Sequence, residues 1–191
     1  MSERKEKILS YIDRNGRGLE IGPSHSPIAP KKEGFNVEII DHASADELRF
    51  KYKDQNVAAI EEVDHVWSGQ SYAELTKKKD HYDWIIASHV IEHVPNLVSF
   101  INSCDEVLDD SGCLVLAVPD YRYCFDQFRA LSSISEVVDS HLANCTLPTA
   151  GDVIDHMLNI SKKGGNIAWG RANCDGENDF LFTVDKALAS F

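Results

Sequence analysis

The chain has 191 residues, of which 43% are hydrophobic and 26% are charged, a composition typical of one soluble globular domain with a proper apolar core. The formal net charge is −12, from 19 basic and 31 acidic residues. Such an acidic surface repels phosphate backbones, so we expect no nucleic-acid partner and no binding to anionic membranes. A local basic pocket could still hold a small acidic substrate.

The N-terminus is charged and no apolar region follows it, so no signal peptide is predicted. No apolar run reaches the length of about 18 residues that a membrane span needs. Five cysteines are scattered along the chain without a C-x-x-C pair. This pattern favours reduced thiols in a cytoplasmic protein.

Helices and strands are predicted to alternate through the first 118 residues. We expect a short charged helix over 3–12, strands at 19–22, 36–41, 60–66, 83–88 and 113–118, and helices at 44–52 and 95–108. The strands are almost continuously apolar, as in sheets that are covered on both faces. The pattern predicts an α/β fold of the Rossmann-like, doubly wound type with a mostly parallel sheet.

The pattern changes after Pro119. Residues 120–179 are polar and mixed, with helical stretches expected at 134–142 and 152–158 and a loop rich in Gly and Asn over 162–178. Phe180–Val184 is predicted as a sixth strand.

Polar residues follow all five predicted strands at their carboxyl ends, where open parallel sheets bind ligands. Asp41 ends the second strand roughly twenty residues after the first glycine turn, as in nucleoside-binding folds, and such an acid can bond both ribose hydroxyls. The fingerprint G-x-G-x-x-G is absent, because Gly16 and Gly18 precede the first strand and prolines follow Gly22. A ligand with a ribose but no phosphate fits this pattern better than a dinucleotide.

Several stretches in this order resemble class I S-adenosylmethionine-dependent methyltransferases. They are Gly-Leu-Glu-Ile-Gly-Pro-Ser at 18–24, Ile-Asp-His at 40–42, Asp-Trp-Ile-Ile-Ala-Ser-His-Val-Ile-Glu-His-Val-Pro-Asn at 83–96 and Val-Pro-Asp at 118–120. The similarity covers roughly residues 8–130. More specifically, these stretches resemble bacterial methyltransferase-domain proteins that are often linked to glycan and cell-surface polysaccharide pathways. It implies a transferase that uses S-adenosyl-L-methionine as its cofactor.

The resemblance also implies roles for individual residues. The cofactor would be bound by Glu20, Gly22, Pro23, Asp41, His42, Asp64, Val66, Trp67, Ser88 and His89. His89 and His93 would be candidate bases for methyl transfer to a hydroxyl of a small-molecule or saccharide acceptor. Arg122, Tyr123 and Arg129 would contact that acceptor.

The same resemblance implies how the chain is divided. We expect 1–191 to be a single domain, with a cofactor-binding core at 1–119 and an acceptor-side or lid segment at 120–191. The family's seven-stranded sheet ends in an antiparallel hairpin, and the sequence predicts that this hairpin is incomplete. A sheet without it exposes an edge, so we consider a homodimer.

Two alternative functions stay open. The first is a non-catalytic or degenerate methyltransferase-like module. The second is a zinc hydrolase, because His89, Glu92 and His93 match the inverted zinc-protease motif H-x-x-E-H. That motif needs both histidines on one face of a stable helix, whereas here it directly follows a strand and Pro95 comes two residues later. We therefore expect no metal site.

Overall fold

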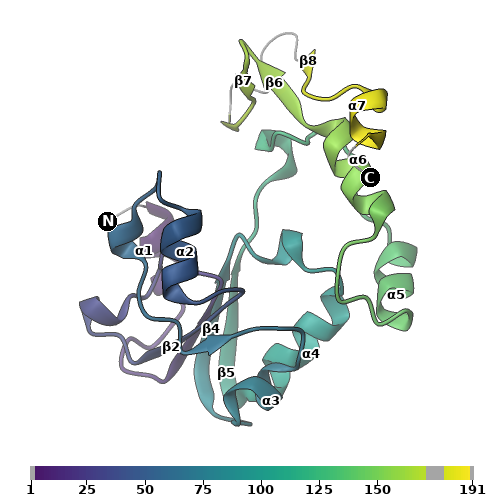
Figure 1. Ribbon diagram of the computed structural model, residues 1–191. Helices are drawn as coiled ribbons and strands as arrows, with labels where there is room; N and C mark the ends of the chain where they lie inside the picture. Colours follow the sequence, from purple (N-terminus) through teal and green to yellow (C-terminus); the bar gives the residue numbers. More distant parts are fainter. Residues whose placement is uncertain (1–2, 171–178, 190–191) are drawn as a thin grey trace. The chain divides into compact units, whose positions relative to one another are not determined.

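Five parallel strands form the central sheet. In a computed structural model, which describes residues 3–170 and 179–189, they are β1 (Gly18–Ile21), β2 (Val37–Asp41), β3 (His65–Val66), β4 (Tyr82–Ser88) and β5 (Leu108–Ala117). The strand order is β3-β2-β1-β4-β5 (Figure 1). Ile21 pairs with Ile40 of β2 on one side and Ala87 of β4 on the other. The order therefore reverses between β1 and β4, where this class of sheet binds ligands.

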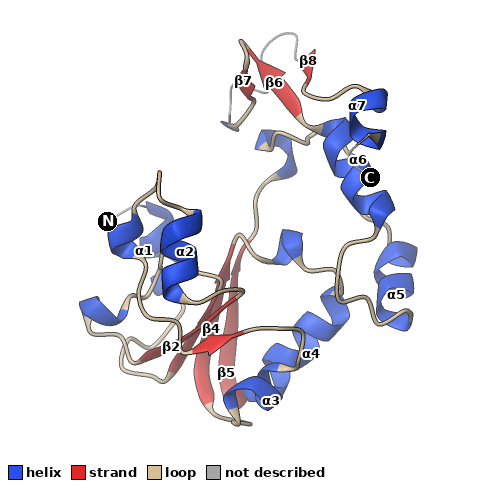
Figure 2. Ribbon diagram, viewed as in Figure 1, coloured by secondary structure: helices blue, strands red, loops and turns tan. Residues whose placement is uncertain are grey.

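Helices cover both faces of this sheet. α1 (Glu3–Leu9) and α2 (Ala45–Lys51) lie on one face, and α3 (Tyr72–Thr76) and α4 (Leu97–Val107) lie on the other (Figure 2). Three short 3₁₀ turns connect them, namely η1 (Lys31–Glu33), η2 (Val57–Ala59) and η3 (Ile91–His93). The predicted Rossmann-like α/β fold is confirmed.

The core centres on Trp84 of β4, whose side chain is completely buried. Its indole Nε1 donates a hydrogen bond to the Asp13 carbonyl oxygen at 2.9 Å, and its ring meets Phe35 edge-on at 6.4 Å. The neighbouring Gly18 leaves room for it, because a Cβ at that position would lie 2.0 Å from the indole. Ile8 and Leu9 of α1 belong to the same apolar cluster, so Trp84 joins α1 to the sheet.

A second, polar network ties β2 to β4. The Glu38 carboxylate accepts hydrogen bonds from the Tyr82 hydroxyl at 2.7 Å and from Lys78, and it lies 2.9 Å from Nε2 of His65. Partial burial raises the pKa of Glu38, but the three hydrogen bonds outweigh it and lower that pKa from 4.5 to about 2. The ionised form is thus favoured by the fold.

Replacing Glu38 by glutamine should therefore lower the free energy of unfolding by about 2 kcal/mol at neutral pH, the usual contribution of hydrogen bonds to a charged group. Because the pKa of Glu38 is lower in the folded chain, this contribution is present above about pH 4.5 and is lost as the pH falls through about 2. Urea unfolding at neutral and acidic pH measures it. The exposed Glu62, replaced in the same way, serves as the control, and equal losses from both variants would contradict the prediction.

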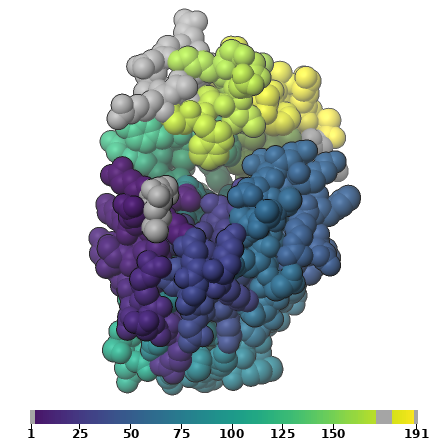
Figure 3. Space-filling model, turned by 90° about the vertical axis from the view of Figure 1, so that its left-hand side faces the viewer, coloured from purple at the N-terminus to yellow at the C-terminus, as the bar shows by residue number. Residues whose placement is uncertain are grey.

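The chain divides into two compact units, and the sheet and its helices belong to the first, which runs to His93 and continues over Leu97–Val118. In the space-filling view, the N-terminal segment (purple) lies on the same face of this unit as later residues coloured from indigo to blue (Figure 3). Val94–Asn96 and the residues from Pro119 onward belong to the second unit.

The second unit contains a small antiparallel sheet of order β7-β6-β8. Its elements are η4 (Tyr121–Tyr123), α5 (Ile134–Leu142), α6 (Ala150–Asn159), β6 (Ser161–Lys163), β7 (Asn166–Ile167), β8 (Asp179–Phe180) and α7 (Val184–Leu188). The Phe125 carbonyl accepts hydrogen bonds from the backbone nitrogen and the hydroxyl of Ser161, and its ring packs 4.7 Å from that of Trp169. Within the described ranges, no helix has the length and apolarity needed to cross a bilayer.

Several predicted elements differ in extent from the observed ones. The third strand is reduced to two residues, because η2 and a loop occupy most of 57–64. The fifth strand, predicted at 113–118, begins earlier: β5 starts at Leu108 with a register shift against β4. The predicted sixth strand at 180–184 is wrong in its extent: only Phe180 is in a strand, which pairs with β6 and not with the parallel sheet.

Candidate functional site

The carboxyl ends of the strands bring several of the predicted residues together. Gly22 donates its backbone N–H to the Ile40 carbonyl oxygen at 2.8 Å, and Trp67 donates to that of Asp41 at the same distance. His89 donates to the Ala117 carbonyl oxygen at 2.9 Å. The residues that follow β1, β3 and β4 are therefore fixed to neighbouring strands along one edge of the sheet.

Asp41, at the end of β2, is nearly fully buried. Its Oδ2 accepts the backbone N–H of Ser24 at 3.0 Å, and its Oδ1 accepts that of His42 at 2.8 Å. Nδ1 of the His42 ring lies 2.7 Å from the same Oδ1. Lys51 lies 2.9 Å from Nε2 of that ring, so Nε2 acts as the acceptor and Nδ1 carries the proton. The imidazole is about half exposed.

Glu20, in the middle of the site's first strand, is also buried, with 1% of its surface exposed. Its Oε1 accepts the backbone N–H of Ile28 at 2.6 Å, and its Oε2 accepts that of Ala29 at 3.0 Å. Burial raises the pKa of Glu20 to about 7, although these two hydrogen bonds lower it. The carboxylate is thus directed at the backbone of the loop after β1, and its predicted contact with a cofactor stays a prediction.

That loop has an unusual backbone. Gly22 has a φ of +62°, and a Cβ there would lie 3.0 Å from the Val90 side chain. Ser24 also lies in the left-handed region, with a φ of +46°, where residues other than glycine are rarely found. Pro23 between them restricts φ, so the path of the chain is fixed where it leaves β1. Strained backbone of this kind is often concentrated at ligand sites.

Three buried side-chain atoms have no hydrogen-bond partner among the described residues: Oγ of Ser24, Nδ1 of His25 and Oγ of Ser88. Ser24 and His25 follow β1, and Ser88 is the last residue of β4; the sheet order reverses between these two strands. Buried polar atoms are normally paired, and leaving one unpaired costs about 1–3 kcal/mol. A polar ligand at this edge would give these atoms their missing partners.

His89 follows directly after Ser88 and has a φ of +57°. Its Nδ1 lies 3.4 Å from a carboxylate oxygen of Glu92, and 44% of its side chain is exposed. Because Glu92 is at Nδ1, Nε2 is the nitrogen left for a substrate. His93 lies at the end of η3 and is exposed.

Three further residues predicted to bind the cofactor, Asp64, Val66 and Trp67, differ from one another in their surroundings. The backbone N–H of Trp67 donates a hydrogen bond to the Asp41 carbonyl oxygen, and the Trp67 indole Nε1 donates to the Gln70 carbonyl oxygen at 2.7 Å. Val66 is 44% exposed. Asp64 accepts the backbone N–H of Ile39 at 2.8 Å and pairs with Lys31, so its carboxylate holds the loop and the strand. Their contact with a ligand stays a prediction.

The zinc-hydrolase alternative finds no support in this geometry. His89 precedes η3 and His93 ends it, so the two histidines are not presented on one face of a regular helix. Across 3–170 and 179–189, no three His, Cys, Asp or Glu side chains are grouped so that they could hold a metal ion.

The predicted acceptor residues belong to the second unit. Arg122 pairs with Asp120, which lowers the pKa of that carboxyl, and its guanidinium lies 5.7 Å from the ring centroid of Tyr123. Arg129 pairs with Asp155 at 2.5 Å. Both arginines thus have acidic partners within their own unit, and their role with an acceptor stays a prediction.

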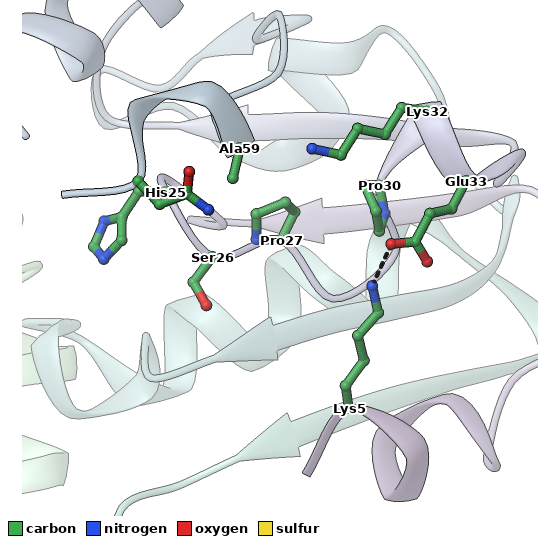
Figure 4. Close-up of a pocket in the computed structure, with 9 residues that line it drawn as sticks. Lys5, His25, Ser26, Pro27, Pro30, Lys32, Glu33 and Ala59 are labelled. Atoms are coloured by element: carbon green, nitrogen blue, oxygen red, sulfur yellow. Dashed lines mark hydrogen bonds and ion pairs between the residues drawn. The ribbon is translucent and has the colours of Figure 1, made fainter. Parts of the chain in front are cut away.

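A cavity of about 220 Å³ lies beside the loop after β1 (Figure 4). The Lys32 ammonium points into it, and Lys5 pairs with Glu33 at its rim at 2.8 Å. It is lined by Lys5, His25, Ser26, Pro27, Pro30, Lys32, Glu33, Asn56 and Ala59. Of the residues at the sheet edge only His25 contributes to it, so this cavity lies next to the candidate site and is not part of it.

Comparison with known protein families assigns the chain to one of them. A family model described as "Methyltransferase domain" matches residues 1–157, most of its length. The chain belongs to the methyltransferase-domain family. This membership confirms the resemblance to class I S-adenosylmethionine-dependent methyltransferases. No curated protein matches the chain.

Solved structures of methyltransferases resemble the chain only distantly. A SAM-dependent methyltransferase from Archaeoglobus fulgidus is 16% identical, with 73% of this chain and 65% of that one covered and a TM-score of 0.48. One from Mesorhizobium loti is 13% identical (63% and 55% covered, TM-score 0.44), and a candidate sarcosine dimethylglycine methyltransferase from Galdieria sulphuraria is 21% identical (59% and 44% covered, TM-score 0.42). Family membership therefore rests on the family model. The chain spans half or less of the length of the first structures that it matches, 44%, 50% and 34%.

Two features of the site were not assigned a role from the sequence. Ser24 and His25 follow the first strand, but only the folded chain shows that their side-chain atoms are buried without partners. Glu61, far along the chain, accepts the backbone N–H groups of Lys31 and Lys32 at 2.6 and 3.0 Å. Such long-range contacts leave no local pattern; the three prolines between 23 and 30 were the only available signal of a rigid loop.

Proposed function

We propose that this chain binds S-adenosylmethionine at the carboxyl edge of its sheet and transfers the methyl group to a hydroxyl of a small-molecule or saccharide acceptor. Family membership supports the reaction class. The observation that carries the proposal is the set of unpartnered buried atoms on Ser24, His25 and Ser88 beside Asp41, which fits a polar nucleoside ligand. The loop has no glycine-rich phosphate cradle, which favours a ligand without a pyrophosphate.

Each residue has its own role in this proposal. Asp41 would accept hydrogen bonds from the ribose hydroxyls, after the His42 ring moves aside. S-adenosylmethionine supplies an activated methyl group, so the protein has mainly to orient the acceptor. Nε2 of His89 would take the proton from the hydroxyl of the acceptor, while Nδ1 of the same ring faces Glu92. The alternative of a non-catalytic module would keep the binding and lose the transfer.

Calorimetric titration with S-adenosylmethionine and S-adenosylhomocysteine tests the binding half of the proposal. We expect both to bind and NAD to bind much more weakly. If neither binds to the wild-type chain, use of this cofactor is refuted.

Replacing Asp41 by alanine should weaken S-adenosylmethionine binding about 30-fold, equal to about 2 kcal/mol for lost hydrogen bonds to a charged group. The matched control is Asp83→Ala. Asp83 also accepts backbone and side-chain hydrogen bonds, from Arg17, but it lies at the start of β4, at the opposite end of the sheet. Equal affinities of the two variants would contradict the role of Asp41.

A further inference from the structure

The segment after β1 has almost no regular secondary structure, yet carboxylates hold its backbone at several points. Asp41 accepts the N–H of Ser24, Glu20 accepts those of Ile28 and Ala29, and Glu61 accepts those of two residues of η1. A doubly wound fold usually places a helix after its first strand, and there the backbone N–H groups bond within the helix. Here acidic side chains from the sheet and from a distant loop take that role.

Of these three acidic residues, Glu20 is the most buried. It is 1% exposed, and each of its oxygens already accepts a backbone N–H. A side chain so enclosed has little surface left for a ligand. The residues it holds lie three to five residues after Ser24 and His25, each of which has a buried side-chain atom with no partner among the described residues.

We infer that Glu20 is a positioning residue whose carboxylate fixes the loop backbone at Ile28 and Ala29, and thereby places Ser24 and His25 for the ligand without touching it. The inference rests on the proposed function in one respect, that the ligand of this loop is S-adenosylmethionine. It departs from the role that the resemblance implies, in which Glu20 lines the cofactor.

The protonation state of Glu20 gives the inference a measurable consequence. Hydrogen bonds from N–H groups are stronger to a carboxylate than to a carboxylic acid. Burial raises the pKa of Glu20 to about 7, Glu61 raises it and Lys5 of α1 lowers it. Glu61 itself faces the backbone of Lys31 and Lys32, and Lys5 pairs with Glu33. The two anchoring bonds should therefore weaken as the pH falls through about 7, and the loop should become less ordered.

The test follows the amide protons of Ile28 and Ala29 by NMR, first without any ligand. In the wild-type chain both resonances should move together with a midpoint near pH 7. In Glu20→Gln this movement should disappear, and both amides should exchange with solvent about tenfold faster, the effect of weakening one charged hydrogen bond. The control Glu62→Gln, at an exposed site, should change neither. Resonances that do not titrate in the wild type would overturn the inference, even if the variant fails to fold.

Binding then separates this inference from the proposed function. Affinity for S-adenosylmethionine should be about tenfold lower in Glu20→Gln than in the wild type at about pH 8, and the difference should shrink below about pH 6, where wild-type Glu20 is protonated. If the wild type binds no cofactor but the amides titrate, the proposed function fails and the anchoring stands. If the amides loosen in the variant but cofactor affinity is unchanged at every pH, Glu20 does not position the site.

Discussion

Replacement of His89 by glutamine should lower kcat/KM for methyl transfer by about 10²–10⁴-fold, the usual contribution of a general base, and should leave cofactor affinity within about twofold. His89 has a left-handed backbone directly after β4 and lies next to the unpartnered Ser88 hydroxyl. Its Nδ1 faces Glu92 at 3.4 Å, which leaves Nε2 toward an acceptor. Glutamine keeps a polar side chain of similar reach but cannot accept a proton near neutral pH.

Transfer of a labelled methyl group from S-adenosylmethionine measures this effect. A panel of hydroxyl-bearing small molecules and saccharides is screened with the wild type first, and the best acceptor is used for the variants. His81→Gln is the matched control, because His81 precedes β4 and so lies at the other end of the same strand. If both variants transfer methyl groups at wild-type rates, His89 is not the base.

Replacement of Trp84 by alanine should lower the free energy of unfolding of the first unit by about 3–5 kcal/mol, as for other large buried aromatic residues. The indole is completely buried, it donates a hydrogen bond to Asp13, and Gly18 fits closely against it. Its loss leaves a cavity in the cluster that joins α1 to the sheet.

Hydrogen exchange of the β4 amides, followed in urea, reports this loss for the first unit alone. Trp169→Ala is the control, because Trp169 belongs to the second unit and is 55% exposed. A loss below about 1 kcal/mol at Trp84 would mean that the cluster closes around the gap.

The fold was largely predictable because its signals are local. Continuous apolar runs marked β1, β2 and β4, and Asp41 at the end of β2 marked the ligand edge. Helix α3 was not predicted, although Ser71 and Glu74 form a capping box at its start. The predicted strand at 180–184 failed for a different reason: Thr183 caps α7 there, and the apolar Phe180 and Val184 are exposed rather than in the core.

The site was predictable in position and less so in the roles of its residues. Strand ends and the order of motifs place Asp41, Ser88 and His89 on one edge. The strand register agrees, because Ile21 pairs with Ile40 and with Ala87, the residues that precede Asp41 and Ser88. The partners of Glu20 lie eight and nine residues away in an irregular loop, and no periodic pattern relates them. The roles of Arg122 and Arg129 depend on an acceptor, and they stay predictions.

An NMR titration of the labelled wild-type chain with S-adenosylmethionine tests the central claim most directly, because it reports both binding and its location. The account predicts saturable shifts at the amides of Ser24, His42, Ser88 and His89, with little change at Lys162 and Ile167 of the small antiparallel sheet. Absence of shifts, or shifts confined to residues away from the carboxyl edge of the parallel sheet, would contradict it.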